Sequence, residues 1–302
     1  MMFLVTQFIG LYVVNYYSPV RVSMENGEKI VQNVSAPELP YGMQTPELNY
    51  ESQYISLFPF IIFAFIIAIF LMFILSKFRV KFFIKLWFFA VVVLALGISF
   101  NSFLHFAPDS SLIALVIAVP LAFIKVYRRN FLIHNSTELL IYPGIAAVFV
   151  PVLNFLTIAA LLILISLYDI WAVWHSGFMQ KMAKYQIDNL QIFSGFFVPY
   201  TSKKLKNKIK KMKMTLKKSE LKKKRIRVNV AILGGGDVIF PIIAAGVMMK
   251  TFGIFSALFV VLGATLGLTY LLINSEKRKF YPAMPFITAG IFIGMALSYI
   301  IL

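Results

Sequence analysis

Long runs of apolar residues dominate this 302-residue sequence and constrain its fold more than any other feature. A helix crosses the hydrocarbon core of a bilayer with about 17–25 residues, and several runs reach that length. Hydrophobic residues make up 60% of the chain and charged residues 14%, whereas about a quarter of the residues in a soluble globular domain are charged. The sequence therefore predicts an all-α, multi-pass integral membrane protein, placed in the cell membrane if the source is prokaryotic.

The apolar runs divide into nine predicted transmembrane helices. The fifth and sixth nearly run together, and only Pro151 marks their junction. The first lacks the positive flank and the small-residue cleavage site of a signal peptide, so we treat it as a span. The predicted spans are 2–16, 55–75, 83–103, 111–126, 139–152, 153–174, 230–249, 252–273 and 281–302.

Basic residues occur in every second loop between these spans. Cytoplasmic loops carry the excess of Lys and Arg in membrane proteins, so the pattern predicts a cytoplasmic N-terminus and an external C-terminus. The alternate loops hold only Arg21, Lys29 and Lys250. The basic loops contain Lys77, Arg79, Lys81 and Lys85, then Lys125, Arg128 and Arg129, then sixteen residues between Lys181 and Arg227, and finally Lys277, Arg278 and Lys279.

Three parts follow from this topology: a six-helix half over residues 1–175, a cytoplasmic basic loop over 176–229, and a three-helix part over 230–302. The loop begins with an apolar stretch that suits the membrane interface and continues as a cationic run. Such a run favours contact with anionic lipid, and without interleaved aromatic residues it does not indicate nucleic-acid binding. The external loop 18–54, rich in Glu and Pro, is expected to be irregular or partly extended.

Metal and thiol chemistry find little support in the sequence. The chain has no cysteine, which excludes disulfides, thiolate metal sites and a cysteine nucleophile. Its histidines, His105, His134 and His175, are scattered and lack the spacing of metal ligands. We therefore predict no metal and no cofactor.

Two aspartates lie well inside predicted spans, where ionisable residues are costly and usually functional. Asp169 lies six residues before His175, or about 9 Å along a helix. Asp237 lies ten residues after Arg227, at most about 15 Å into the next, antiparallel span. Both are thus predicted at similar depth in the cytoplasmic half. Glu138 begins the fifth span, where an anchoring or pairing role is expected.

Paired carboxylates have a specific chemistry, because two that share a site cannot both ionise cheaply and so hold one proton between them. The ionised partner can deprotonate water while the protonated partner donates to a carbonyl oxygen, as in aspartic proteases. A proton or ion relay in a transporter or channel uses intramembrane carboxylates as well. A purely structural pair is a third interpretation.

Gly234, Gly235 and Gly236 directly precede Asp237. Each disfavours a helix by about 1 kcal/mol relative to Ala, and together they permit close approach of another backbone. Close helix packing is an alternative explanation for such small residues.

Three short motifs together resemble those of the presenilin and signal peptide peptidase family. Tyr168-Asp169 in the sixth span resembles the YD motif, and Gly234–Asp237 in the seventh resembles GxGD. Pro282-Ala283-Met284, at the start of the ninth span, resembles the Pro-Ala-Leu motif with Met in place of Leu, a swap of similar volume. The order of the motifs and the nine-span count match too, and the predicted orientation and short loops resemble microbial, archaeal-type presenilin homologues.

The resemblance implies intramembrane cleavage of single-span proteins or peptides, with Asp169 and Asp237 as the catalytic dyad. It implies substrate-binding roles for Tyr168, for Gly234–Gly236 and for Pro282, Ala283 and Met284, although an aromatic residue at the interface is an alternative for Tyr168. Part of the loop 176–229 is expected to help hold the unwound substrate. The sequence does not indicate whether partner proteins are required.

Overall fold

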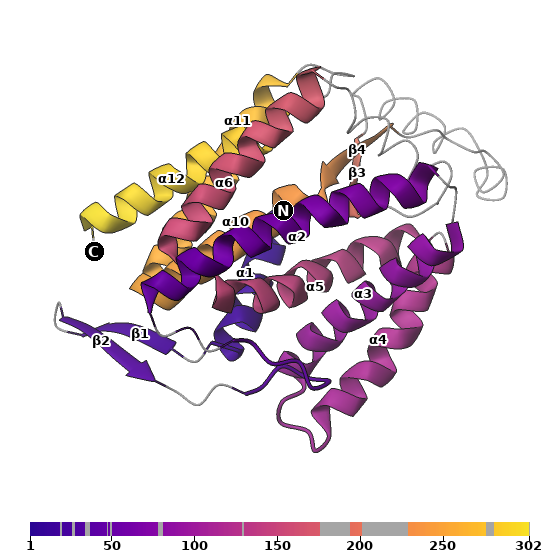
Figure 1. Ribbon diagram of the computed structural model, residues 1–302, viewed down its shortest axis with the longest axis horizontal. Helices are drawn as coiled ribbons and strands as arrows, with labels where there is room; N and C mark the ends of the chain where they lie inside the picture. The colour runs from indigo at the N-terminus through magenta and orange to yellow at the C-terminus, as the bar shows by residue number, and fades with distance from the viewer. Residues whose placement is uncertain are drawn as a thin grey trace, which may run out of the picture.

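Helices form nearly all the regular structure in the described parts of the chain (Figure 1). Among the described residues, eight helices are long and apolar enough to cross a membrane, and α1 (Met2–Tyr16) is apolar but shorter. The predicted multi-pass membrane protein is confirmed, although two β-hairpins depart from a purely α class. This computed structural model describes residues 1–18, 20–25, 28–33, 37–46, 48, 50–77, 81–128, 130–175, 194–200, 229–275 and 281–301.

The first six predicted spans are all present as helices. A 3-10 turn at Val150–Val152 separates the fifth from the sixth, as Pro151 predicted. Asn154 then caps the sixth helix, because its side chain accepts from the Thr157 amide while the Thr157 hydroxyl accepts from the Asn154 amide. After α1, the helices are α2 (Glu51–Lys77), α3 (Lys81–Phe103), α4 (Ser110–Tyr127), α5 (Phe131–Phe149) and α6 (Phe155–Ile170), which continues as a π-helical turn, Trp171–His175.

Helix α5 begins at Phe131, so the predicted start at residue 139 was wrong. The Asn130 side chain caps it by accepting from the amides of Leu132 and Ile133. Glu138 consequently lies inside the helix and is fully buried. Its pairing role is real, since Lys125 donates to it over 2.6 Å. Lys125 itself, predicted in a loop, is a buried residue of α4.

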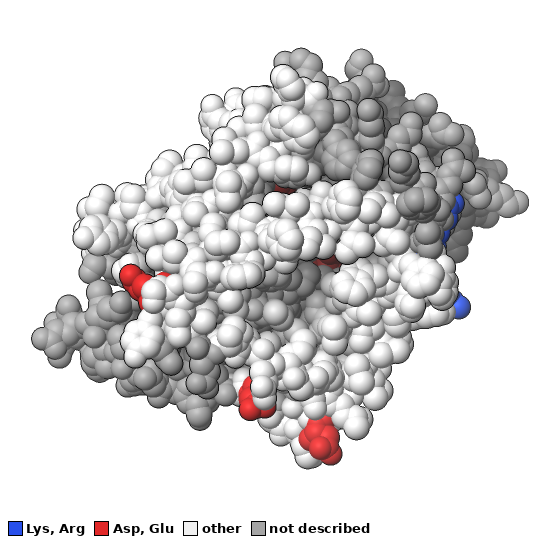
Figure 2. Space-filling model, in the orientation of Figure 1, with Lys and Arg blue, Asp and Glu red and all other residues white. Residues whose placement is uncertain are grey.

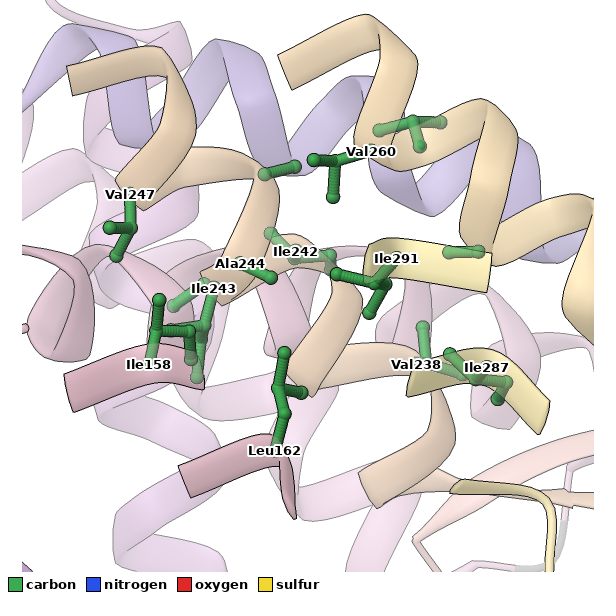
Figure 3. Packing of buried hydrophobic residues seen from close by; sticks show 14 of the residues in the cluster. Ile158, Leu162, Val238, Ile242, Ile243, Ala244, Val247, Val260, Ile287 and Ile291 are labelled. Carbon is green, nitrogen blue, oxygen red and sulfur yellow. The ribbon is translucent and has the colours of Figure 1, made fainter. Parts of the chain in front are cut away.

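Helix α10 (Gly235–Phe252) forms the centre of the structure, packed against α1, α5, α6, α11 (Ile254–Asn274) and α12 (Met284–Ile301). Its residues from Pro241 to Met249 are all buried. Figure 3 shows Ile242 and Val238 of α10 converging with Ile158 and Leu162 of α6 and with Ile287 and Ile291 of α12. The central helix, which carries Asp237, is thus held on several sides by apolar contacts.

Two antiparallel hairpins lie at opposite ends of the helices (Figure 1). One pairs β1 (Val20–Glu25) with β2 (Glu28–Asn33), which confirms that the loop 18–54 is partly extended. The other pairs β3 (Gly195–Tyr200) with β4 (Asn229–Gly234). The seventh span was predicted to begin at residue 230, but β4 occupies that stretch because it pairs with β3, and the helix begins at Gly235.

The described surface carries little charge across the face shown in Figure 2, where Asp and Glu appear mainly at the lower and left edges and Lys and Arg at the right edge. An uncharged band of this kind suits the hydrocarbon region of a bilayer. Of the predicted basic loop 176–229, only residues 194–200 and 229 are among the described residues. The three-part division of the chain therefore stays a prediction.

Candidate active site

The structure brings Asp169 and Asp237 close enough to interact electrostatically. Asp169 lies near the end of α6 and is 5% exposed. Asp237 lies in the first turn of α10 and is partly exposed. The neighbouring helices α6 and α10 thus hold the two carboxylates within electrostatic range of each other.

The Pro282-Ala283-Met284 segment meets Asp169 directly. The Met284 amide donates to Asp169 Oδ2 over 3.0 Å, and the Ala283 amide also hydrogen-bonds this carboxylate. Helix α12 begins at Met284 rather than at residue 281, so these donors belong to its unpaired N-terminal amides. Such amides bind anionic groups well, and here they orient the Asp169 carboxylate.

A second bond ties the same two helices one turn away. The Ser166 hydroxyl donates to Thr288 Oγ1 over 2.8 Å, and both residues are buried. Ser166 precedes Asp169 by one helical turn and Thr288 follows Met284 by one turn. Together the contacts fix the position of α6 relative to the start of α12.

Asp237 is held within its own helix. Gly234 is the N-cap of α10, and its amide hydrogen-bonds the Asp237 carboxylate three residues on, as the acidic member of a capping box does. On the next residue, the buried Gln7 side chain of α1 donates to the Val238 carbonyl over 3.1 Å. Pro241 has no amide hydrogen, so the Asp237 carbonyl lacks its usual helical donor.

The three glycines differ in their surroundings. A Cβ on Gly235 would lie 2.8 Å from Ser194 Oγ and 3.0 Å from the Tyr142 hydroxyl. A Cβ on Gly234 would lie 3.1 Å from Asp237 Oδ2. On Gly236 it would meet only Phe240, at 3.7 Å, which is ordinary contact. A side chain at Gly235 or Gly234 would therefore crowd its neighbours, whereas Gly236 has room for one.

Tyr168 is 39% exposed and packs against the Trp171 ring, with centroids 6.4 Å apart. It neighbours Asp169 in sequence and interacts with it electrostatically. Both predicted roles, substrate contact and interfacial aromatic, fit this position. Among the described residues, no group of three or more His, Asp and Glu side chains is arranged to hold a metal ion.

Comparisons with known proteins identify the family. The family model described as signal-peptide peptidase, presenilin aspartyl protease matches residues 30–302. The chain belongs to this family. It is accordingly an aspartic endopeptidase of the intramembrane-cleaving kind, and the resemblance read from its motifs is confirmed.

Solved structures show the same fold. Two crystal structures of "a presenilin family intramembrane aspartate protease", in space groups C222 and P2, each match with a TM-score of 0.60 at 17% sequence identity. Each match covers 100% of this chain, and 97% and 96% of the respective crystallised chains. No curated protein sequence matches the chain.

Sequence reasoning missed the strand β3 and the polar face of α5 near Asp237. Gly235 donates its amide to the Ser194 carbonyl over 3.3 Å, so the hairpin leads directly into the start of α10. Tyr142 of α5 interacts electrostatically with both Glu138 and Asp237. The spacing of His134, Asn135 and Glu138 on one helical face was the available signal for this contact.

Proposed function

We propose that this protease hydrolyses peptide bonds within transmembrane helices and that Asp169 and Asp237 form its catalytic dyad. The observation that carries the proposal is their convergence, with Asp169 oriented by the amides of Ala283 and Met284 and Asp237 partly exposed beside it. Three segments far apart in the sequence meet at one pair of carboxylates. Together these segments contain all three of the motifs that carry the family resemblance.

The reaction uses one shared proton. The ionised carboxylate takes a proton from water as the water oxygen attacks the scissile carbonyl carbon, and the protonated carboxylate donates to the carbonyl oxygen. The tetrahedral intermediate then collapses: the C–N bond breaks as the amide nitrogen gains a proton, and the dyad returns to its singly protonated state. The products are a new carboxylate and a new amine, and neither a metal nor a covalent intermediate is involved.

A helical substrate must unwind locally, because its carbonyls are hydrogen-bonded and shielded within the helix. The hairpin β3–β4 offers an extended partner. Gly195 and Phe197 direct both their amide and carbonyl groups toward α5. The backbone hydrogen bonds to β4 therefore come from the residues that alternate with them, such as Phe196. Phe197 lies opposite Ile232, so the amide and carbonyl groups of Ile232 point away from β3, and those of Val230, two residues earlier, do the same. We infer that the unwound substrate pairs along this edge of β4, which ends at Gly234 beside Asp237.

The three glycines and Tyr168 complete the proposed substrate site. Gly236 has room beside it in the described structure, which supports close approach of a substrate backbone next to Asp237. Tyr168 would border the same site from α6. Pro282 would help expose the segment before α12, because proline cannot continue regular backbone pairing.

The orientation of the chain is also a proposal. Under the positive-inside rule the β3–β4 hairpin and both aspartates lie toward the cytoplasm, and β1–β2 lies outside. Such a site near one membrane face would shorten the path of water to the dyad.

One experiment separates proteolysis from the proton-transport alternative, which depends on the same two carboxylates. Purified protein would be reconstituted in sealed vesicles with a synthetic single-span peptide and an internal pH dye. We expect peptide fragments to accumulate without proton flux across an imposed gradient. Proton flux without fragments would contradict the proposal.

A further inference from the structure

A buried polar cluster on α5 holds the outer edge of β3. The Asn135 side chain forms a bidentate contact with one strand residue: its Nδ2 donates to the Phe197 carbonyl over 2.9 Å, and its Oδ1 accepts from the Phe197 amide over 3.1 Å. This pair of bonds has the pattern that a neighbouring strand would offer. The side-chain amide thus takes the place of a third strand at Phe197.

Gly195, two residues earlier on the same edge, is held in the same way. Its amide donates to Glu138 Oε1 over 3.3 Å, and its carbonyl lies 2.8 Å from His134 Nε2. Gly195 has φ of 148°, a conformation that favours glycine. Four backbone groups of β3 are therefore occupied by three side chains of one helix.

Buried charge fixes this cluster in place. Lys125 Nζ of α4 donates to Glu138 Oε1 over 2.6 Å and lies 3.4 Å from His134 Nδ1. The Lys125 and Glu138 side chains are 1% and 0% exposed. Buried ion pairs contribute little net stability, and their best-supported use is to specify one arrangement among alternatives. Here the arrangement specified is the position of Glu138 against β3.

The cluster also reaches the candidate dyad. Tyr142, one turn after Glu138, packs edge-on against Phe196 of β3, with centroids 5.7 Å apart. Its hydroxyl lies 3.0 Å from the position that a Cβ on Gly235, two residues before Asp237, would occupy. Any shift of β3 relative to α5 would therefore shift the start of α10.

We propose that Asn135, Glu138 and His134 are positioning residues that close the β3 edge to other strands and so confine an extended substrate to β4. This inference rests on the proposed function. An open β3 edge would offer a second, competing register for an unwound peptide. The α5 side chains remove that register and hold β4 at a fixed distance from Asp237.

The first test replaces Asn135 with a residue of similar volume that cannot hydrogen-bond. Asn135→Leu is compared with Asn101→Leu, because Asn101 is also a buried asparagine that hydrogen-bonds, to Tyr17 and Ser110, at the other end of the molecule. We expect Asn135→Leu to raise KM for a synthetic single-span peptide about tenfold, a few-fold for each lost hydrogen bond. New cut positions should appear as well, whereas Asn101→Leu should leave KM and the cut positions as they are in the wild type.

A second pair of variants covers the case in which Asn135→Leu does not fold. Lys125→Met/Glu138→Gln and Lys125→Met/Glu138→Leu remove the same two charges, so neither leaves an unpaired buried charge. Only the Gln variant keeps an oxygen that accepts from the Gly195 amide. We expect its KM to be several-fold lower than that of the Leu variant, with fewer new cut positions.

The outcomes separate the two proposals. Equal KM values and equal cut positions within both comparisons would overturn the positioning role while wild-type cleavage upheld the protease. A lack of cleavage by wild-type protein in vesicles would overturn both. The positioning role would be supported by a higher KM and new cut positions in Asn135→Leu but not in Asn101→Leu. The same difference between Lys125→Met/Glu138→Leu and Lys125→Met/Glu138→Gln would also support it.

Discussion

At the scale of single residues, the glycines before Asp237 have separate roles. A Cβ on Gly235 would crowd Tyr142 and Ser194, whereas a Cβ on Gly236 would make only ordinary contact with Phe240. We predict that Gly235→Ala destabilises the protein by about 1–3 kcal/mol, because the added methyl group overpacks this contact. Thermal unfolding in detergent measures the effect.

Gly236→Ala is the matched change one residue on. It should leave stability unchanged or raise it by up to about 1 kcal/mol, since Ala is the better helix former. If the substrate backbone approaches here, this stable variant should nevertheless cleave more slowly than wild type. A Gly236→Ala protein with normal cleavage would remove Gly236 from the proposed substrate site.

Two further residues near Asp169 were beyond sequence reasoning. Ser166 and Thr288 are ordinary polar residues in apolar helices, and nothing in the sequence shows that α6 and α12 bring them within 2.8 Å. Lys125 was interpreted as a loop charge, because its ion pair with Glu138 depends on how α4 packs against α5. Contacts between helices follow from packing geometry, which one sequence does not display.

At the scale of elements, the contact between α6 and the start of α12 should be measurable as a coupling. Ser166→Ala and Thr288→Val each remove one partner of the same buried hydrogen bond. A double-mutant cycle on thermal stability should give a coupling of about 0.6 kcal/mol, the average for hydrogen bonds between membrane helices, and no more than about 1.7 kcal/mol. Strict additivity of the two changes would mean that this bond does not link the helices.

The helices themselves were largely predictable, and the hairpin was not. Runs of apolar residues mark spans because lipid tolerates little else, and Pro151 located the break between α5 and α6. Strand β3 is only six residues long and contains Pro199, and 28 residues separate its end from the start of its partner β4. A pairing between segments so far apart in the chain produces no local pattern of apolar residues from which it could be predicted. Both aspartates could be identified from the sequence because an ionisable residue inside a membrane span is costly and is therefore usually functional.

At the scale of the whole molecule, the orientation in the membrane can be tested directly, because the chain contains no cysteine. Single cysteines would be introduced at Asp109, between α3 and α4, and at Asn130, between α4 and α5. Positive-inside topology predicts that a membrane-impermeant maleimide labels Asp109→Cys in intact cells and labels Asn130→Cys only after lysis. The reverse pattern would invert the proposed topology.

The central claim is that Asp169 and Asp237 together cut peptide bonds inside the membrane. Its most direct test is mass spectrometry of the fragments that a purified, reconstituted protein makes from a single-span peptide, with Asp169→Asn and Asp237→Asn alongside. These isosteric changes keep the fold and remove one carboxylate each. We predict wild-type cuts within the apolar span and a rate loss of about a thousandfold or more in either variant, as for loss of a member of a catalytic unit. Fragments at the wild-type rate from either variant would contradict the dyad.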